Sequence, residues 1–101
     1  MVERAARRFA VLSDANRLRL LNLLLSSGER SVGSLAAELD TSQANVSKHL
    51  KALHDAGIIA REPRGTAVFY SVADPSIKKL CQIVCDRLTA QARSEARALG
   101  A

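Results

Sequence analysis

Aromatic residues are scarce in this sequence, and their scarcity limits what the core can be made of. Phe, Tyr and Trp together make up 3% of the chain and Trp is absent, whereas 48% of all residues are hydrophobic. The core must therefore be built from Leu, Val, Ile and Ala, a composition that favours helices over an all-β fold. With 101 residues, we expect a single domain over residues 1–101.

Long apolar runs are missing as well. No segment approaches the roughly 20 apolar residues that span a bilayer, and the first residues lack the apolar core and cleavage site of a secretory signal. Only two cysteines are present, Cys81 and Cys85, so the fold needs no disulfide framework. We therefore expect a cytoplasmic protein in a reducing compartment, without a membrane partner.

Acidic residues are outnumbered by basic ones. The chain has 10 Asp and Glu against 15 Lys and Arg, which gives a formal net charge of +5. This balance fits a polyanionic partner, usually nucleic acid or an anionic membrane. A solvated basic surface without a partner explains the charge equally well, so the charge alone does not decide between them.

The motifs that carry enzymatic chemistry are absent too. The sequence contains no Gly-rich phosphate loop, no nucleophile elbow and no HExxH pair. The two cysteines are separated by three residues rather than two, and no βαβ pattern surrounds them, which argues against a thiol oxidoreductase. We therefore expect no enzyme.

Periodicity and capping residues predict five helices. Ser13 or Asp14 caps the second, Ser31 begins the third, and Thr41 or Ser42 caps the fourth, because their side-chain oxygens accept bonds from open amides. The first helix covers residues 2–12 and the last covers residues 75–98.

Between the fourth and fifth helices the periodicity changes. Two β-prone runs, residues 58–62 and 67–72, flank a turn at residues 63–66 and predict a hairpin. The predicted fold is mainly α with a small β-hairpin, in the order α-α-α-α-β-β-α. Two helices joined by a short turn and followed by a basic hairpin are the parts of a winged helix-turn-helix.

The fourth helix has one apolar and one polar face. At about 100° per residue, Val46, Leu50 and Leu53 fall within one arc. Ser47, Lys48, Lys51 and Asp55 face the other way. An ordinary amphipathic surface helix shows the same pattern, but here a short turn precedes the helix and a basic hairpin follows it.

The exposed side chains of this region suit DNA. Gln can bond adenine through two hydrogen bonds, Ser can donate or accept at several base edges, and Lys neutralises phosphates. In the hairpin, arginines flank the turn, where they can follow the backbone or enter the minor groove. We therefore predict that the following residues contact DNA: Ser42, Gln43, Ser47, Lys48, Lys51, Arg61 and Arg64.

Several ordered segments resemble the ArsR/SmtB family of repressors. They are residues 12–21 (LSDANRLRLL), residues 42–53 (SQANVSKHLKAL) and the hairpin pieces at residues 56–59, 64–65 and 68–72, within a match over about residues 9–90. The resemblance implies a homodimer whose interface is formed by helices 2–12 and 75–98. It also implies binding of double-stranded DNA at an inverted repeat, repression that an inducer relieves, and DNA contacts at Gln43, Ser47 and Lys48.

The sequence departs from the family's metal sites. Residues 35–39 (LAAEL) lack the cysteine pair that metal sensors often carry in the third helix, and the last helix has no histidine. Neither site is therefore carried over. His49 and His54 lie on the fourth helix, where we expect a hydrogen-bonded structural role for His49, solvent exposure for His54, and no metal at either.

Cys81 and Cys85 lie four residues apart on the last helix and share its apolar stripe. Buried cysteine often serves as a small apolar residue. In a dimer, however, up to four thiols would gather near the interface and suit a thiophilic metal or metalloid, or undergo oxidation. The sequence leaves both interpretations open, and it requires no cofactor.

The function predicted here is a DNA-binding transcriptional repressor that acts as a homodimer on an inverted-repeat operator; release by a thiol-reactive, metal or metalloid inducer is one of the two interpretations of Cys81 and Cys85. The alternative is a winged-helix protein-interaction module without an inducer, because fold does not settle function.

Overall fold

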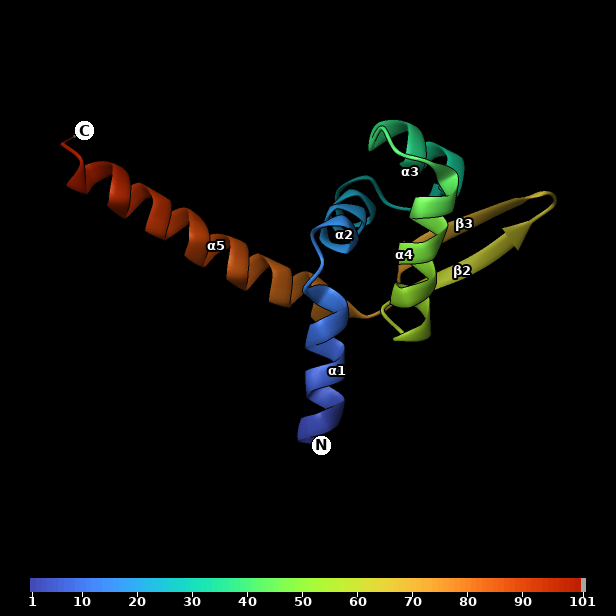
Figure 1. Ribbon diagram of the computed structural model, residues 1–101, viewed down its shortest axis with the longest axis horizontal. Helices are drawn as coiled ribbons and strands as arrows, with labels where there is room; N and C mark the ends of the chain where they lie inside the picture. The colour runs from blue at the N-terminus through green and yellow to red at the C-terminus, as the bar shows by residue number, and fades with distance from the viewer. Residues whose placement is uncertain (101) are drawn as a thin grey trace.

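The computed structural model describes residues 1–100 and contains five helices and a three-stranded sheet (Figure 1). The elements follow the predicted order, with one short strand added, and the winged helix-turn-helix is confirmed. Along the chain they are α1 (Val2–Leu12), α2 (Ala15–Ser27), β1 (Arg30–Ser31), α3 (Val32–Glu38), α4 (Gln43–Asp55), β2 (Ile59–Arg64), β3 (Ala67–Val72) and α5 (Pro75–Ala98).

Short polar side chains begin four of the five helices. The Asp14 carboxylate accepts the backbone amides of Asn16 and Arg17, and the Arg17 amide in particular lowers the pKa of Asp14. Ser42 accepts the Asn45 amide and begins α4. Where the sequence left two candidates, the structure selects Asp14 and Ser42. Ser31 and Asp74 cap α3 and α5 in the same way.

Aliphatic side chains form the core, as the composition requires. They come from the end of α1, from α2, α3 and α4, from the junction of α4 with β2 and from the first turns of α5. The fully buried members are Leu20, Leu21, Leu35, Val46, Leu50, Leu53, Ile58 and Ile77. Burial of each such side chain contributes about 1.5–3 kcal/mol to folding. Because three of them belong to α4, the cluster that stabilises the domain also fixes the position of this helix.

The sheet differs from the prediction at two points. Strand β1 is only two residues long and pairs with β3, which gives the order β1-β3-β2; two residues are too few to produce an alternating pattern. The turn is also shorter than expected, because Pro63 and Arg64 continue β2 and only Gly65 and Thr66 connect it to β3. Pro63 is tolerated there because β2 is an edge strand, and Gly65 adopts φ 61°, which favours glycine.

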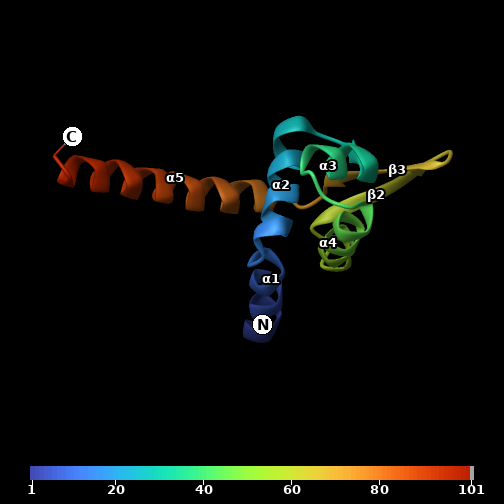
Figure 2. The ribbon, with the colours of Figure 1, turned by 45° about the horizontal axis from the view of Figure 1, so that its top comes forward.

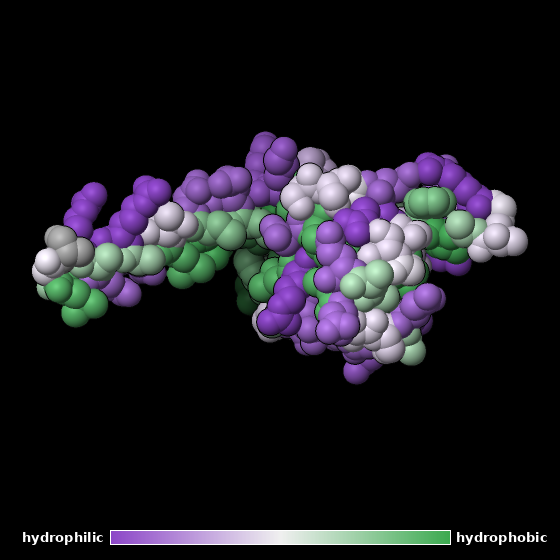
Figure 3. All heavy atoms as spheres, turned by 90° about the horizontal axis from the view of Figure 1, so that it is seen from above, coloured by the Kyte–Doolittle hydropathy of each residue, from purple (hydrophilic) through white to green (hydrophobic). Residues whose placement is uncertain are grey.

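Helices α1 and α5 extend away from the body of the domain (Figures 1 and 2). Of the 24 residues of α5, only Ile77 is buried. Apolar side chains line one side of α5 (Figure 3). The large exposed apolar residues of the two helices are Val2, Phe9, Ile83, Val84 and Leu88. None of the helices described in residues 1–100 combines the length and the hydropathy that a membrane span requires.

Candidate nucleic-acid interface

Helix α4 separates its buried and exposed faces as the sequence predicts. Val46, Leu50 and Leu53 are at most 1% exposed, and the helix contacts α2, α3 and β2. Ser47, Lys48 and Lys51 lie on the exposed face. The core therefore holds the helix rigidly while its polar face stays open to solvent.

The residues at the start of α4 differ in how free they are. Ser42 uses its hydroxyl oxygen to cap the helix, with 3.1 Å to the Asn45 amide nitrogen, so its hydroxyl proton and its second lone pair remain for a ligand. Gln43 is exposed, and its side-chain amide lies close to Gly33 of α3. If Gly33 carried a Cβ atom, that atom would lie 3.6 Å from the Gln43 amide nitrogen. The structure thus brings Gln43 to the junction of the two helices of the helix-turn-helix.

The two predicted lysines are in different electrostatic settings. Lys51 Nζ donates to Asp55 at 2.7 Å, and this bond raises the pKa of the lysine and lowers that of the aspartate. Lys48 has no hydrogen-bond partner within the described part of the chain. Lys48 is consequently the uncompensated positive charge on the outer face of α4.

Arg64 at the tip of the wing is held by two carboxylates. Its guanidinium binds both oxygens of Glu29, one of them at 3.0 Å, and donates to Glu62 at 2.8 Å. It also lies 5.0 Å from the centre of the Phe69 ring, and the Glu29 bond raises its pKa. We name this arrangement of Arg64 with Glu29 and Glu62 the wing clasp. Arg61, by contrast, is exposed and has no such partner among residues 1–100.

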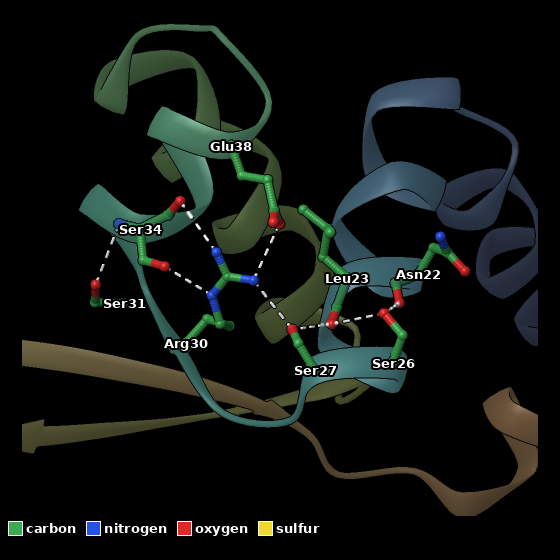
Figure 4. A network of polar contacts seen from close by, with 8 residues as sticks. All are labelled: Asn22, Leu23, Ser26, Ser27, Arg30, Ser31, Ser34 and Glu38. Atoms are coloured by element: carbon green, nitrogen blue, oxygen red, sulfur yellow. Dashed lines mark hydrogen bonds and ion pairs between the residues drawn. The ribbon is translucent and has the colours of Figure 1, made fainter.

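Sequence reasoning did not find the residue that joins α2 to α3. Arg30 donates to Ser27 at 3.0 Å, to the Ser34 hydroxyl at 2.7 Å and to Glu38 at 3.0 Å (Figure 4). Its side chain is only 18% exposed, so these charge-assisted bonds are partly shielded from water. Because α3 leads directly into α4, Arg30 helps to orient the helix-turn-helix. The flanking serines and Glu38 are the only sequence signal for this role.

The two histidines follow their predictions in part. His54 is exposed, as expected. His49 is buried, as expected, but its Nδ1 has no hydrogen-bond partner within the described chain, so the hydrogen-bonded role at that atom is not seen. No group of three or more His, Cys, Asp or Glu in residues 1–100 is arranged to hold a metal ion.

The two cysteines, whose burial the sequence left open, lie in different environments. Cys81 is half-buried against the core, and burial raises the pKa of its thiol. Cys85 is exposed, because α5 has left the domain body by that point. The more accessible thiol is therefore Cys85, whereas Cys81 also serves to pack α5 against the domain.

Comparison with known proteins identifies the family. A family model described as bacterial regulatory protein, arsR family, matches residues 14–61. The arsenical resistance operon repressor of Bacillus subtilis is 30% identical over 80 residues, 79% of this chain and 76% of that protein. The chain belongs to the arsR family of bacterial regulatory proteins.

Two further matches cover much of the chain. An uncharacterized HTH-type transcriptional regulator of Methanocaldococcus jannaschii is 35% identical over 82 residues, 81% of this chain and 92% of that one. The solution structure of a homodimeric winged helix-turn-helix DNA-binding domain of Mycobacterium bovis, a possible ArsR-family regulator, has 30% identity and a TM-score of 0.75, over 84% of this chain and 81% of its own. This ArsR-family chain is accordingly a DNA-binding transcription regulator and not an enzyme.

Release of the wing clasp should strengthen DNA binding by this ArsR-family protein. Glu29→Gln removes one of the two carboxylates that neutralise Arg64 and leaves only the Glu62 bond, which a phosphate displaces more readily, so Arg64 gains one phosphate contact. We expect the slope of the log binding constant against the log salt concentration, on a random DNA duplex, to steepen by about 0.9. Fluorescence anisotropy titrations at several salt concentrations measure this slope.

The matched control is Asp86→Asn, which removes the same charge from an exposed site on α5. Equal slopes for the two variants would show that Arg64 does not reach DNA. Adding Arg64→Gln to Glu29→Gln should abolish the gain.

Proposed function

We propose that this protein represses transcription as a homodimer that binds an inverted-repeat operator with one copy of α4 in each half-site. The observation that carries the proposal is the polar outer face of α4, held by a buried face and flanked by a basic wing. An α-helix fits the major groove of B-DNA, where each base pair presents its own pattern of donors and acceptors. The B. subtilis relative, named a repressor of the arsenical resistance operon, supports the repressor role.

The side chains divide into two groups by their chemistry. Gln43 and Ser47 carry the donors and acceptors that read base edges, with the Ser42 hydroxyl at the helix start. Lys48 and Lys51 neutralise phosphates and position the helix. In the wing, Arg61 is free to bind DNA, whereas Arg64 must first leave Glu29 and Glu62.

The exposed apolar faces of α1 and α5 support a dimer built from these two helices. Val84 and Leu88 are 48% and 58% exposed on α5, and Phe9 is 61% exposed on α1. Monomeric proteins rarely expose large contiguous apolar patches. A second copy that covers them in a symmetric pair would fix the distance between the two α4 helices, and the homodimeric M. bovis neighbour shares this fold.

Two substitutions on α4 test the DNA-binding proposal. Lys48→Gln should weaken binding about equally on all sequences and reduce the salt slope by about 1, whereas Gln43→Ala should cost about 1–3 kcal/mol only on the specific site. Duplexes from the upstream region of the gene, with a scrambled duplex as control, separate the two effects in anisotropy titrations. If neither variant differs from the unmodified protein on either duplex, Gln43 and Lys48 do not contact DNA and the proposed role of the polar face of α4 is wrong.

We further propose that a thiophilic inducer acts at Cys81 and Cys85. Arsenite is a suitable class: each thiol that binds As(III) replaces one hydroxide of arsenous acid and releases water. Cys85 is exposed and Cys81 is one helical turn away, so the first bond would form at Cys85. In the dimer, such bonds would bias the pose of the two α5 helices and hence of the two α4 helices.

The double variant Cys81→Ser/Cys85→Ser tests this inducer. It should bind operator DNA as the unmodified protein does but fail to release it when arsenite or cadmium is added under reducing conditions. Ser94→Ala, also on the exposed part of α5, is the control: it alters α5 without removing a thiol and should still release DNA when the inducer is added. Full release of the double variant by the inducer would show that neither cysteine is needed for the response.

A further inference from the structure

Helix α1 has two different faces. At about 100° per residue, Arg4, Arg7 and Val11 fall on one side, and Val2 and Phe9 fall on the opposite side. The apolar side is the one that a second copy of the chain would cover. A dimer formed through it therefore leaves the arginine side of α1 open.

The arginine side of α1 faces the C-terminal half of α4 across an open groove. The groove has a volume of about 810 Å³ and is lined by Arg4, Arg7, Ala52 and Asp55, among others. Arg8 closes its base, because it donates to the Ala56 carbonyl at 2.8 Å and pairs with Asp74. The contacts of Arg8 thus join α1 to the C-terminal end of α4 and to the start of α5, and Arg4 and Arg7 are left without a hydrogen-bond partner within residues 1–100.

A second, smaller cavity lies along the same flank of α4. It has a volume of about 160 Å³ and is lined by Arg19 of α2 and by Asn45 and His49 of α4. Asn45, His49 and Ala52 occupy one side of α4, at three- and four-residue spacing, so both cavities open on that side. His49 is 6% exposed, and its Nδ1 has no partner in the described chain. The polar lining of this cavity is therefore incompletely satisfied.

The charge along this flank is predominantly positive. Arg4, Arg7 and Arg19 are all exposed. The one carboxylate that lines either cavity is Asp55, and its charge is already compensated by Lys51 at 2.7 Å. An anionic occupant is thus favoured over an apolar segment of a partner protein, and the proposed DNA-binding function makes the phosphates of DNA the anion to test.

We propose that Arg4, Arg7 and Arg19, named here the arginine flank, form a second backbone-binding surface that contacts the phosphates of one DNA strand while α4 lies in the major groove. The inference rests on the proposed DNA-binding function. The major groove is about 12 Å wide and a helix with its side chains about 10–12 Å across, so a phosphate chain passes each side of the inserted helix. The wing extends from one side of α4 and α1 lies on the other side (Figures 1 and 2), so the wing would approach one phosphate chain and the arginine flank the other.

The salt dependence of binding to a random 30-base-pair duplex tests the arginine flank. Arg4→Gln/Arg7→Gln should flatten the slope by about 0.9 for each lost contact, which makes its loss of affinity between about 50 and 200 mM salt roughly tenfold smaller. The control Arg93→Gln/Arg97→Gln removes the same charge from exposed positions on α5, opposite its apolar stripe. It should keep the slope of the unmodified protein.

Because α1 also belongs to the proposed dimer interface, sedimentation must show that the Arg4→Gln/Arg7→Gln variant keeps its oligomeric state. Arg19→Gln, on α2, provides an independent measurement outside the interface and should flatten the slope by about 0.9. If both flank variants match the control while the unmodified protein binds with a steep slope, the arginine flank does not contact DNA. If the unmodified protein shows no salt-dependent binding, the proposed function itself fails.

Discussion

The burial of Val46, Leu50 and Leu53 is the constraint on which the remaining structure depends. These three side chains place α4 against α2, α3 and β2, and they leave its polar face outside. Removal of such a side chain from a close-packed core costs about 2–5 kcal/mol, so the orientation of α4 is bound to the stability of the domain. The surface offered to DNA is consequently rigid, and little conformational entropy is lost when it binds.

Around α4, the charged side chains fall into free and restrained groups. Lys48 and Arg61 are free, whereas Lys51 and Arg64 already have carboxylate partners. A phosphate that binds Lys51 or Arg64 must displace the carboxylate already paired with it, which reduces the net binding free energy of that contact. Arg30 serves a different purpose, because its partly shielded bonds hold the end of α2 to α3. Some basic residues of this domain are therefore available to bind DNA, whereas Arg30 maintains the arrangement of the helices that bind it.

Local sequence signals predicted the helices well and the long-range contacts poorly. The bounds expected for the first and last helices agree with α1 and α5, because a capping Asp and a Pro mark the start of α5 and regular apolar spacing marks both. Strand β1 was missed because two residues carry no period. The contact between Glu29 and Arg64 was missed because 35 residues separate them. The exposure of Cys85 depends on where α5 leaves the domain, which its own periodicity does not record.

The apolar faces of α1 and α5 link this monomer to its proposed activity. A helix of 24 residues is about 36 Å long, and most of α5 has no partner in the isolated chain. If a second copy covers these faces, the separation of the two α4 helices is fixed, and with it the spacing of the half-sites that the dimer can bind. The same contact would transmit any event at Cys81 or Cys85 to the DNA-binding surfaces.

The most direct test of this account is sedimentation equilibrium combined with DNA titration for the unmodified protein, Leu88→Asp and Thr89→Asp. Leu88 lies on the apolar stripe of α5, and the adjacent Thr89 lies off it. The account predicts that the unmodified protein and Thr89→Asp are dimers that bind operator DNA, whereas Leu88→Asp is a monomer with weakened operator binding. A monomeric unmodified protein, or a Leu88→Asp monomer that binds the operator as tightly, would contradict it.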